Sequence, residues 1–97
     1  MIVSFADEGT EDIYDGKDTR KARKTCPPEV WQRAQDKMTV MNAVAEVEEL
    51  RIPPSNRLEA LKGKRKGQWS IRINDQYRIC FRWTEKGPAD VEIVDYH

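Results

Sequence analysis

The sequence is poor in the residues that build metal centres and disulfide frameworks. It contains one histidine and two cysteines in 97 residues, and Cys26 and Cys80 lie far apart with no CxxC motif near either. This scarcity disfavours a metal site and a secreted, disulfide-stapled domain. No apolar run approaches the ~20 residues of a membrane-spanning helix, and the first residues lack the apolar core of a signal peptide. We therefore expect a cytoplasmic protein with no cofactor, no metal and no membrane partner.

The length and composition favour one folded domain over residues 1–97. Charged residues make up 35% of the chain, but the tryptophans, tyrosines and phenylalanines supply bulky apolar groups for a core, which argues against disorder. A chain of this size buries one modest core between two layers of secondary structure.

The zero net charge of the chain conceals a separation of charge along it. Residues 1–50 carry 7 basic and 11 acidic side chains, a net of −4, whereas residues 51–97 carry 10 and 6, a net of +4. Residues 57–82 alone carry 8 basic and 2 acidic side chains. Such a patch attracts polyanions, including RNA. The alternative is that these charges are solvated and keep sheet edges from pairing with other chains.

Hydrophobic periodicity predicts helices in the first half of the chain. We expect a short strand at residues 1–5, a polar helix at 6–14 and an irregular basic link at 16–25. A long amphipathic helix should then run from residue 27 to about residue 50, because its apolar residues recur every three or four positions. The prolines that follow it should end it.

The second half changes to the two-residue period of strands. Residues 69–73 and 77–83 alternate apolar and polar side chains on either side of a turn, which is typical of an antiparallel hairpin, and a last strand is expected at 91–96. The predicted fold class is α+β, with two N-terminal helices packed on one face of a small, mainly antiparallel sheet. The arginines should lie on the other, open face.

The basic half of the chain also holds the groups that RNA cleavage needs. Arginine and lysine bind a phosphate and stabilise its developing charge, and tyrosine stacks on unpaired bases. Histidine or a carboxylate moves protons between a ribose 2′-OH and the leaving 5′ oxygen. The candidates for catalysis are Arg78, Asp95, Tyr96 and His97, and the candidates for phosphate binding are Arg57, Lys62, Lys64 and Arg72.

Each candidate also has an ordinary structural explanation. His97 ends the chain and terminal residues often fray, Asp95 can form a structural ion pair, and Tyr96 can cover the edge of the sheet.

Three spaced motifs are the most specific feature of the sequence. They are RLEALKG at residues 57–63, GQWSIRINDQYRICF at residues 67–81 and VEIVDYH at residues 91–97. Together they resemble the HigB toxins of the RelE/ParE-like superfamily of toxin–antitoxin systems. The resemblance implies a RelE-like fold and a ribosome-dependent, metal-independent endoribonuclease that cuts mRNA and inhibits translation. It also implies a HigA-type helix-turn-helix antitoxin, and the 70S ribosome with its mRNA, as partners; DNA would be contacted only through the antitoxin.

The resemblance assigns roles residue by residue. Asp95, Tyr96 and His97 match the family's active-site terminus, Lys62 matches its basic position, and Arg78 matches the superfamily's phosphate-binding arginine. One departure concerns Glu59, which stands where some members have histidine. Either Glu59 takes part in proton transfer, or the terminal residues carry the chemistry with more help from the cations.

A second class of function uses the same surface without catalysis. A non-catalytic RNA-binding or ribosome-binding module, or a gyrase poison, is compatible with the same fold. The combination of a phosphate clamp with a terminal imidazole favours the nuclease, because a passive module does not need an imidazole there.

Overall fold

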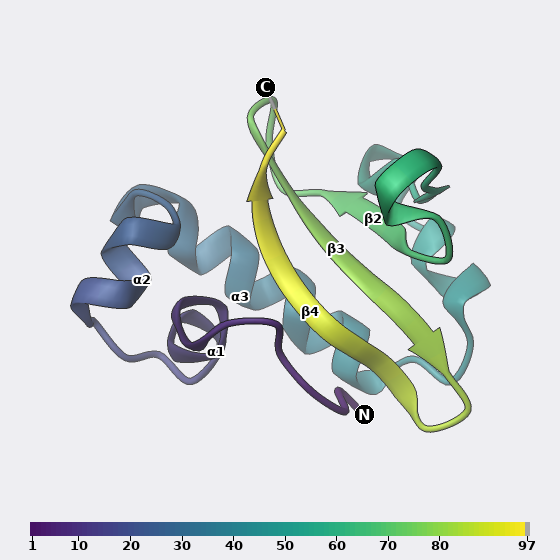
Figure 1. Ribbon diagram of the computed structural model, residues 1–97, viewed down its shortest axis with the longest axis horizontal. Coiled ribbons are helices and arrows are strands. Elements are labelled where there is room, and N and C mark those ends of the chain that lie inside the picture. The colour runs from purple at the N-terminus through teal and green to yellow at the C-terminus, as the bar shows by residue number, and fades with distance from the viewer. Residues whose placement is uncertain (97) are drawn as a thin grey trace.

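The computed structural model describes residues 1–96 and has an α+β architecture (Figure 1). Its helices come first: α1 (Glu8–Tyr14), α2 (Arg20–Thr25) and α3 (Pro28–Ala43). Its strands follow: β1 (Glu59–Ala60), β2 (Trp69–Arg72), β3 (Tyr77–Thr84) and β4 (Gly87–Asp95). Three short 3₁₀ helices, η1 (Val47–Arg51), η2 (Pro54–Asn56) and η3 (Gly63–Arg65), lie in the connections.

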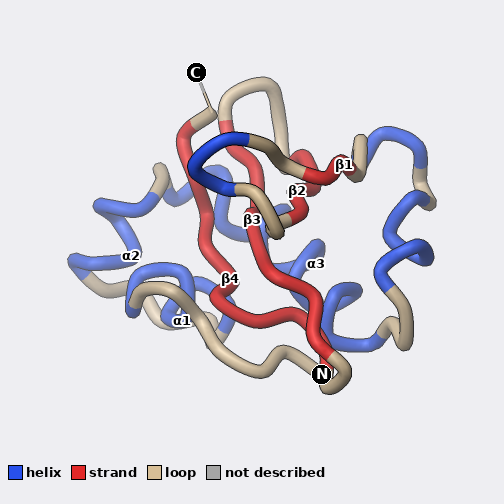
Figure 2. Tube along the Cα trace, turned by 45° about the vertical axis from the view of Figure 1, so that its right-hand side comes forward, coloured by secondary structure: helices blue, strands red, loops and turns tan. Residues whose placement is uncertain are grey.

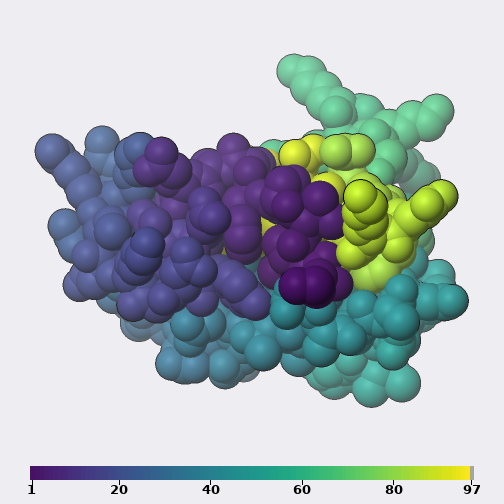
Figure 3. Space-filling model, turned by 90° about the horizontal axis from the view of Figure 1, so that it is seen from below, coloured from purple at the N-terminus to yellow at the C-terminus, as the bar shows by residue number. Residues whose placement is uncertain are grey.

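The strands form one antiparallel sheet in the order β1-β2-β3-β4. The predicted hairpin is confirmed, with Ile71 opposite Ile79 and, on the next pair, Ile79 opposite Ile93. The expected first strand is instead an extended segment beside β4, with a parallel bridge between Phe5 and Val91. In Figure 3 this N-terminal segment lies between the helical region and the turn that joins β3 to β4.

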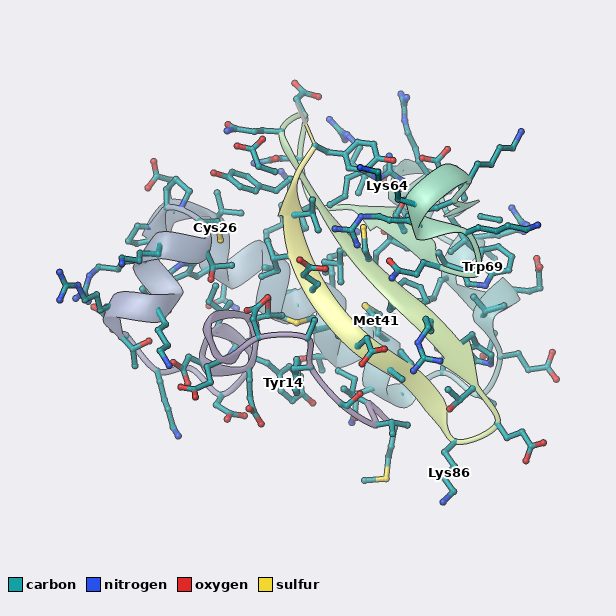
Figure 4. The ribbon with its side chains drawn as sticks, in the orientation of Figure 1. Tyr14, Cys26, Met41, Lys64, Trp69 and Lys86 are labelled. Atoms are coloured by element: carbon teal, nitrogen blue, oxygen red, sulfur yellow. The ribbon has the colours of Figure 1, made fainter. Side chains whose placement is uncertain are left out.

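The core lies between α3 and one face of the sheet. The α3 residues Met38 and Met41 and the sheet residues Ile71, Ile79 and Phe81 are all fully buried. They occupy the apolar positions of the helical and the alternating pattern, which is why the two layers pack together. Figure 1 shows α3 crossing behind β3 and β4, and Met41 is labelled there in Figure 4.

The N-terminal half contains one more helix than the two that were expected. The stretch interpreted as an irregular basic link contains α2, because the Thr19 side chain accepts a hydrogen bond from the Ala22 amide and caps a short helix. Ala22 is fully buried, so this helix packs on its neighbours despite its basic surface.

The long helix ends earlier than expected, at Ala43 rather than near residue 50. Val44 adopts an extended backbone with ψ of 147°, and the chain starts again as η1 through a capping box between Glu46 and Glu49. Leu50 is nevertheless fully buried. The apolar pattern therefore predicts that Leu50 is buried, but it does not predict the change from an α-helix to a 3₁₀ turn.

We expected the face of the sheet opposite α3 to be open, but part of it is covered. Ser70 and Cys80, both on that face, are fully buried. The segment around η3 lies on this side of the sheet in both Figure 1 and Figure 2. Arg65 of η3 forms an ion pair with Glu92 of β4 at 3.2 Å, which ties the segment to the sheet.

Candidate active site

A pocket of about 210 Å³ near the end of β4 gathers several of the predicted site residues. Its wall is formed by Arg57, Arg72, Asn74, Asp75, Arg78 and Tyr96. Four of the predicted residues meet here although they come from three separate parts of the chain. Three guanidinium groups and one carboxylate line this small hollow, so its net positive charge favours an anion.

Arg78 is the most constrained of the three arginines. Its side chain is only 12% exposed, and its Nη2 donates a hydrogen bond of 2.7 Å to the carbonyl oxygen of Arg57. Its guanidinium carbon lies 5.3 Å from the centre of the Tyr96 ring, within the range of a cation–π contact. Its Nε is buried and has no hydrogen-bond partner within residues 1–96. This arginine is therefore held in place.

Arg57 and Arg72 reach the pocket from the ends of η2 and β2. Arg57 follows η2 and adopts a left-handed backbone with φ of 47°, an uncommon conformation for a residue that is not glycine. Arg72 is the last residue of β2 and forms an ion pair with Asp75 in the turn before β3. Asp75 is almost fully exposed, so solvent screens this pair and much of the arginine's charge remains available.

The predicted C-terminal cluster is only partly within the described residues. Asp95 ends β4 and accepts a hydrogen bond of 3.1 Å from Gln76 Nε2, while the Tyr96 amide donates to the Gln76 carbonyl oxygen at 2.6 Å. Tyr96 is 44% exposed, so one part of its ring is free to stack on a base. His97 lies outside the described residues.

Glu59 is close to the site, whereas the two predicted lysines are not part of the pocket wall. The Glu59 carboxylate lies 3.7 Å from Arg78 Nη2, and its side chain is 51% exposed. Lys62 precedes η3 and Lys64 lies within it, and both are exposed. Lys64 is labelled above the sheet in Figure 4. These lysines extend the positive surface outside the pocket.

Two residues near the site were not predicted from the sequence. Asn74 Oδ1 accepts hydrogen bonds from the amides of Gln76 and Tyr77, which fixes the turn that forms one side of the pocket. Gln76 in turn positions the end of β4 through the bonds to Asp95 and Tyr96. An asparagine at the start of a turn is a recognisable signal for such a bond, but the partner of Gln76 is evident only from the strand pairing.

No group of three or more histidine, cysteine, aspartate and glutamate side chains in residues 1–96 could hold a metal ion. None of the helices in the same range is long and apolar enough to cross a membrane.

Comparison with known proteins identifies the family. The model of the HigB-like toxins, described as RelE-like toxins of type II toxin–antitoxin systems, matches residues 3–97. Toxin HigB-1 of Vibrio cholerae is 35% identical over 97 residues, which cover all of this chain and 98% of that protein. Endoribonuclease HigB of Proteus vulgaris is 27% identical over the full length of both chains. An uncharacterized protein of Haemophilus influenzae is 30% identical over 81% of this chain and 75% of its own length. The chain therefore belongs to the HigB-like family of RelE-like toxins of type II toxin–antitoxin systems.

Proposed function

We propose that this protein is an endoribonuclease that cleaves mRNA on the ribosome and thereby inhibits translation. The observation that carries the proposal is the convergence of Arg57, Arg72 and Arg78 with the exposed ring of Tyr96 around one pocket. Three cationic side chains can bind a phosphodiester, and an aromatic ring beside them can stack on an unpaired base. The relative from Proteus vulgaris is named an endoribonuclease, which agrees with this chemistry.

The reaction is an in-line transesterification. The ribose 2′ oxygen forms a bond to phosphorus while the bond to the 5′ oxygen breaks, so the products carry a 2′,3′-cyclic phosphate and a 5′-OH. One group accepts the proton of the 2′-OH, and another donates a proton to the leaving oxygen. Arg78 would contact the scissile phosphate and stabilise the charge that develops on its oxygens.

The proton acceptor is best assigned to Glu59. Its carboxylate lies 3.7 Å from Arg78 Nη2, so a phosphate bound to Arg78 brings the adjacent ribose toward Glu59. His97 is assigned the donation to the leaving oxygen, in keeping with its match to the family's terminal residue. Asp95 would orient the end of β4 through Gln76.

The shallow site explains why a ribosome would be required. The pocket is small, and Tyr96 and Glu59 are both about half exposed, so the protein alone holds few atoms of an RNA strand. Positioning by the ribosome can supply several kcal/mol of the barrier. The partners are then the 70S ribosome with its mRNA and a HigA-type antitoxin. The protein would contact DNA only through that antitoxin, and it would act in the cytoplasm.

A purified translation system tests the proposal. We expect mRNA cleavage only when ribosomes are present, with 2′,3′-cyclic phosphate and 5′-OH ends, and no cleavage of the same RNA alone. Tight ribosome binding without any cleavage would contradict the proposal and favour a non-catalytic binding module. Efficient cleavage of naked RNA would contradict the ribosome requirement.

A further inference from the structure

A second group of cations lies on α3, and the proposed reaction does not use it. Arg33 and Lys37 are four residues apart on this helix, so they lie on the same helical face. Arg33 is exposed and Lys37 is half-buried. Within residues 1–96, no carboxylate lies within ion-pair distance of either side chain.

Lys37 is held toward the loop that presents Arg57. Its Nζ donates a hydrogen bond to Asn56 Oδ1, and Asn56 is only 2% exposed. The side-chain nitrogen of Asn56, Nδ2, donates to the carbonyl oxygens of Leu50 at 3.1 Å and Ile52 at 3.4 Å. These bonds fix the direction of Asn56 Oδ1. The next residue is Arg57, in the pocket wall. A buried asparagine thus connects the helix cation to the pocket.

The positive charges of α3 and the pocket act on one another. Burial, together with the charges of Arg33 and Arg72, lowers the pKa of Lys37. Arg72 lines the pocket, so its field extends to α3. Cations that repel one another weaken the folded state, and a bound anion relieves that repulsion. The nearby carboxylates of Asp36 and Asp75 are engaged by Gln32 and Arg72 respectively.

We propose that Arg33 and Lys37 form a second phosphate-binding position, which holds the backbone of the RNA strand whose scissile phosphate occupies the arginine pocket. This inference rests on the proposed function, since it assumes that RNA enters that pocket. The strand would then pass from Tyr96 across Arg72 to α3. Lys62 and Lys64 lie at η3, on the other side of the sheet from α3 (Figure 1), so they would contact a different part of the strand.

Salt-dependent binding of a short single-stranded RNA with 2′-O-methyl groups tests the inference without cleavage. The substitutions are Lys37→Gln, which keeps a donor for Asn56, and Arg33→Gln, which changes an exposed residue. Each should lower the slope of log K against log salt concentration by about 0.7, the contribution of one phosphate contact on a single strand. In the double variant this slope should fall by about twice as much.

Lys86→Gln is the matched control, because Lys86 is exposed in the turn at the far end of the sheet (Figure 4). Its slope should equal that of the unmodified protein. Slopes unchanged in the α3 variants would overturn the inference, provided that Arg78→Ala lowers the slope in the same assay. Weaker binding of the α3 variants to vacant ribosomes, with an unchanged slope for the short RNA, would also overturn it, because the phosphate would then belong to ribosomal RNA. Cleavage is measured separately, so failure of the proposed reaction remains distinguishable from failure of this binding position.

Discussion

At the scale of single residues, the site depends on groups that restrain one another. Arg78 contacts the Arg57 carbonyl oxygen, the Glu59 carboxylate and the Tyr96 ring. A guanidinium that is already oriented loses little conformational entropy when it binds a phosphate, and its planar fork fits two phosphate oxygens.

The ring of Tyr96 is predicted to matter more than its hydroxyl group. Tyr96→Phe keeps the aromatic face above Arg78 and should cleave within about threefold of the unmodified protein. Tyr96→Ala removes stacking worth about 1–3 kcal/mol, so cleavage should fall at least tenfold. Single-turnover rates on programmed ribosomes measure both. Equal loss in the two variants would show that the hydroxyl takes part in proton transfer.

Glu59 is predicted to act in the chemical step. Glu59→Gln keeps the size of the side chain but removes the proton acceptor, so the single-turnover rate should fall by about 10²–10⁴. Ribosome affinity should not decrease, because one negative charge is removed from a surface that binds RNA. If Glu59 only counterbalances Arg78, the variant will instead bind RNA more tightly and cleave at an undiminished rate.

At the scale of secondary-structure elements, the packing of α1 against α2 depends on Gly9. A Cβ at this position would lie 2.6 Å from the carbonyl oxygen of Lys21 and would also collide with Thr25 Oγ1. The backbone of Lys21 cannot move aside as a flexible side chain can. The two helices therefore approach each other as closely as they do because one of them presents glycine.

Gly9→Ala should destabilise the protein even though alanine favours helices. The steric conflict is expected to cost about 1–3 kcal/mol, which exceeds the gain of about 1 kcal/mol in helix propensity. Urea unfolding measures the change in free energy. Glu11→Ala, an exposed change in the same helix, is the control and should alter stability by less than about 0.5 kcal/mol. A Gly9→Ala variant as stable as this control would contradict the packing described here.

Cys26, directly after α2, predicts a loss of stability at alkaline pH. Burial raises the pKa of its thiol from 9.0 to about 11, although a hydrogen bond from Trp31 opposes the shift. Between these values the unfolded state releases its proton first, so the free energy of unfolding should fall as pH rises from 9 to 11. One such group contributes a slope of at most about 1.4 kcal/mol per pH unit. Cys26→Ala should show a shallower decline over the same range, and identical slopes would contradict the assignment.

The sequence patterns identify these elements unevenly. The hairpin is predictable because Ile71 and Ile79 alternate with polar neighbours around a turn that Asn74 fixes. The end of α3 is not predictable from the pattern, because a 3₁₀ turn buries Leu50 as well as a continued helix would. The short α2 depends on a single capping threonine, which a basic stretch obscures.

At the scale of the whole molecule, the separation of charge in the sequence becomes a separation in space only in part. The pocket takes Arg57, Arg72 and Arg78 from the basic half of the chain. Lys37 comes from the acidic half and still joins this positive surface, because α3 packs beneath the sheet and brings it to Asn56. Counting charges along the chain cannot reveal such a contact, since it depends on how two distant segments pack.

The central claim is that the pocket of three arginines beside Tyr96 holds the scissile phosphate. The most direct test is the single-turnover cleavage rate of Arg78→Ala on ribosomes saturated with the protein, so that binding does not limit the rate. Loss of a positioned donor to the reacting phosphate should lower this rate by about 10²–10³. Thermal melting must confirm that the variant is folded, since Arg78 is largely buried. A folded Arg78→Ala protein that cleaves mRNA at the unmodified rate would contradict the account.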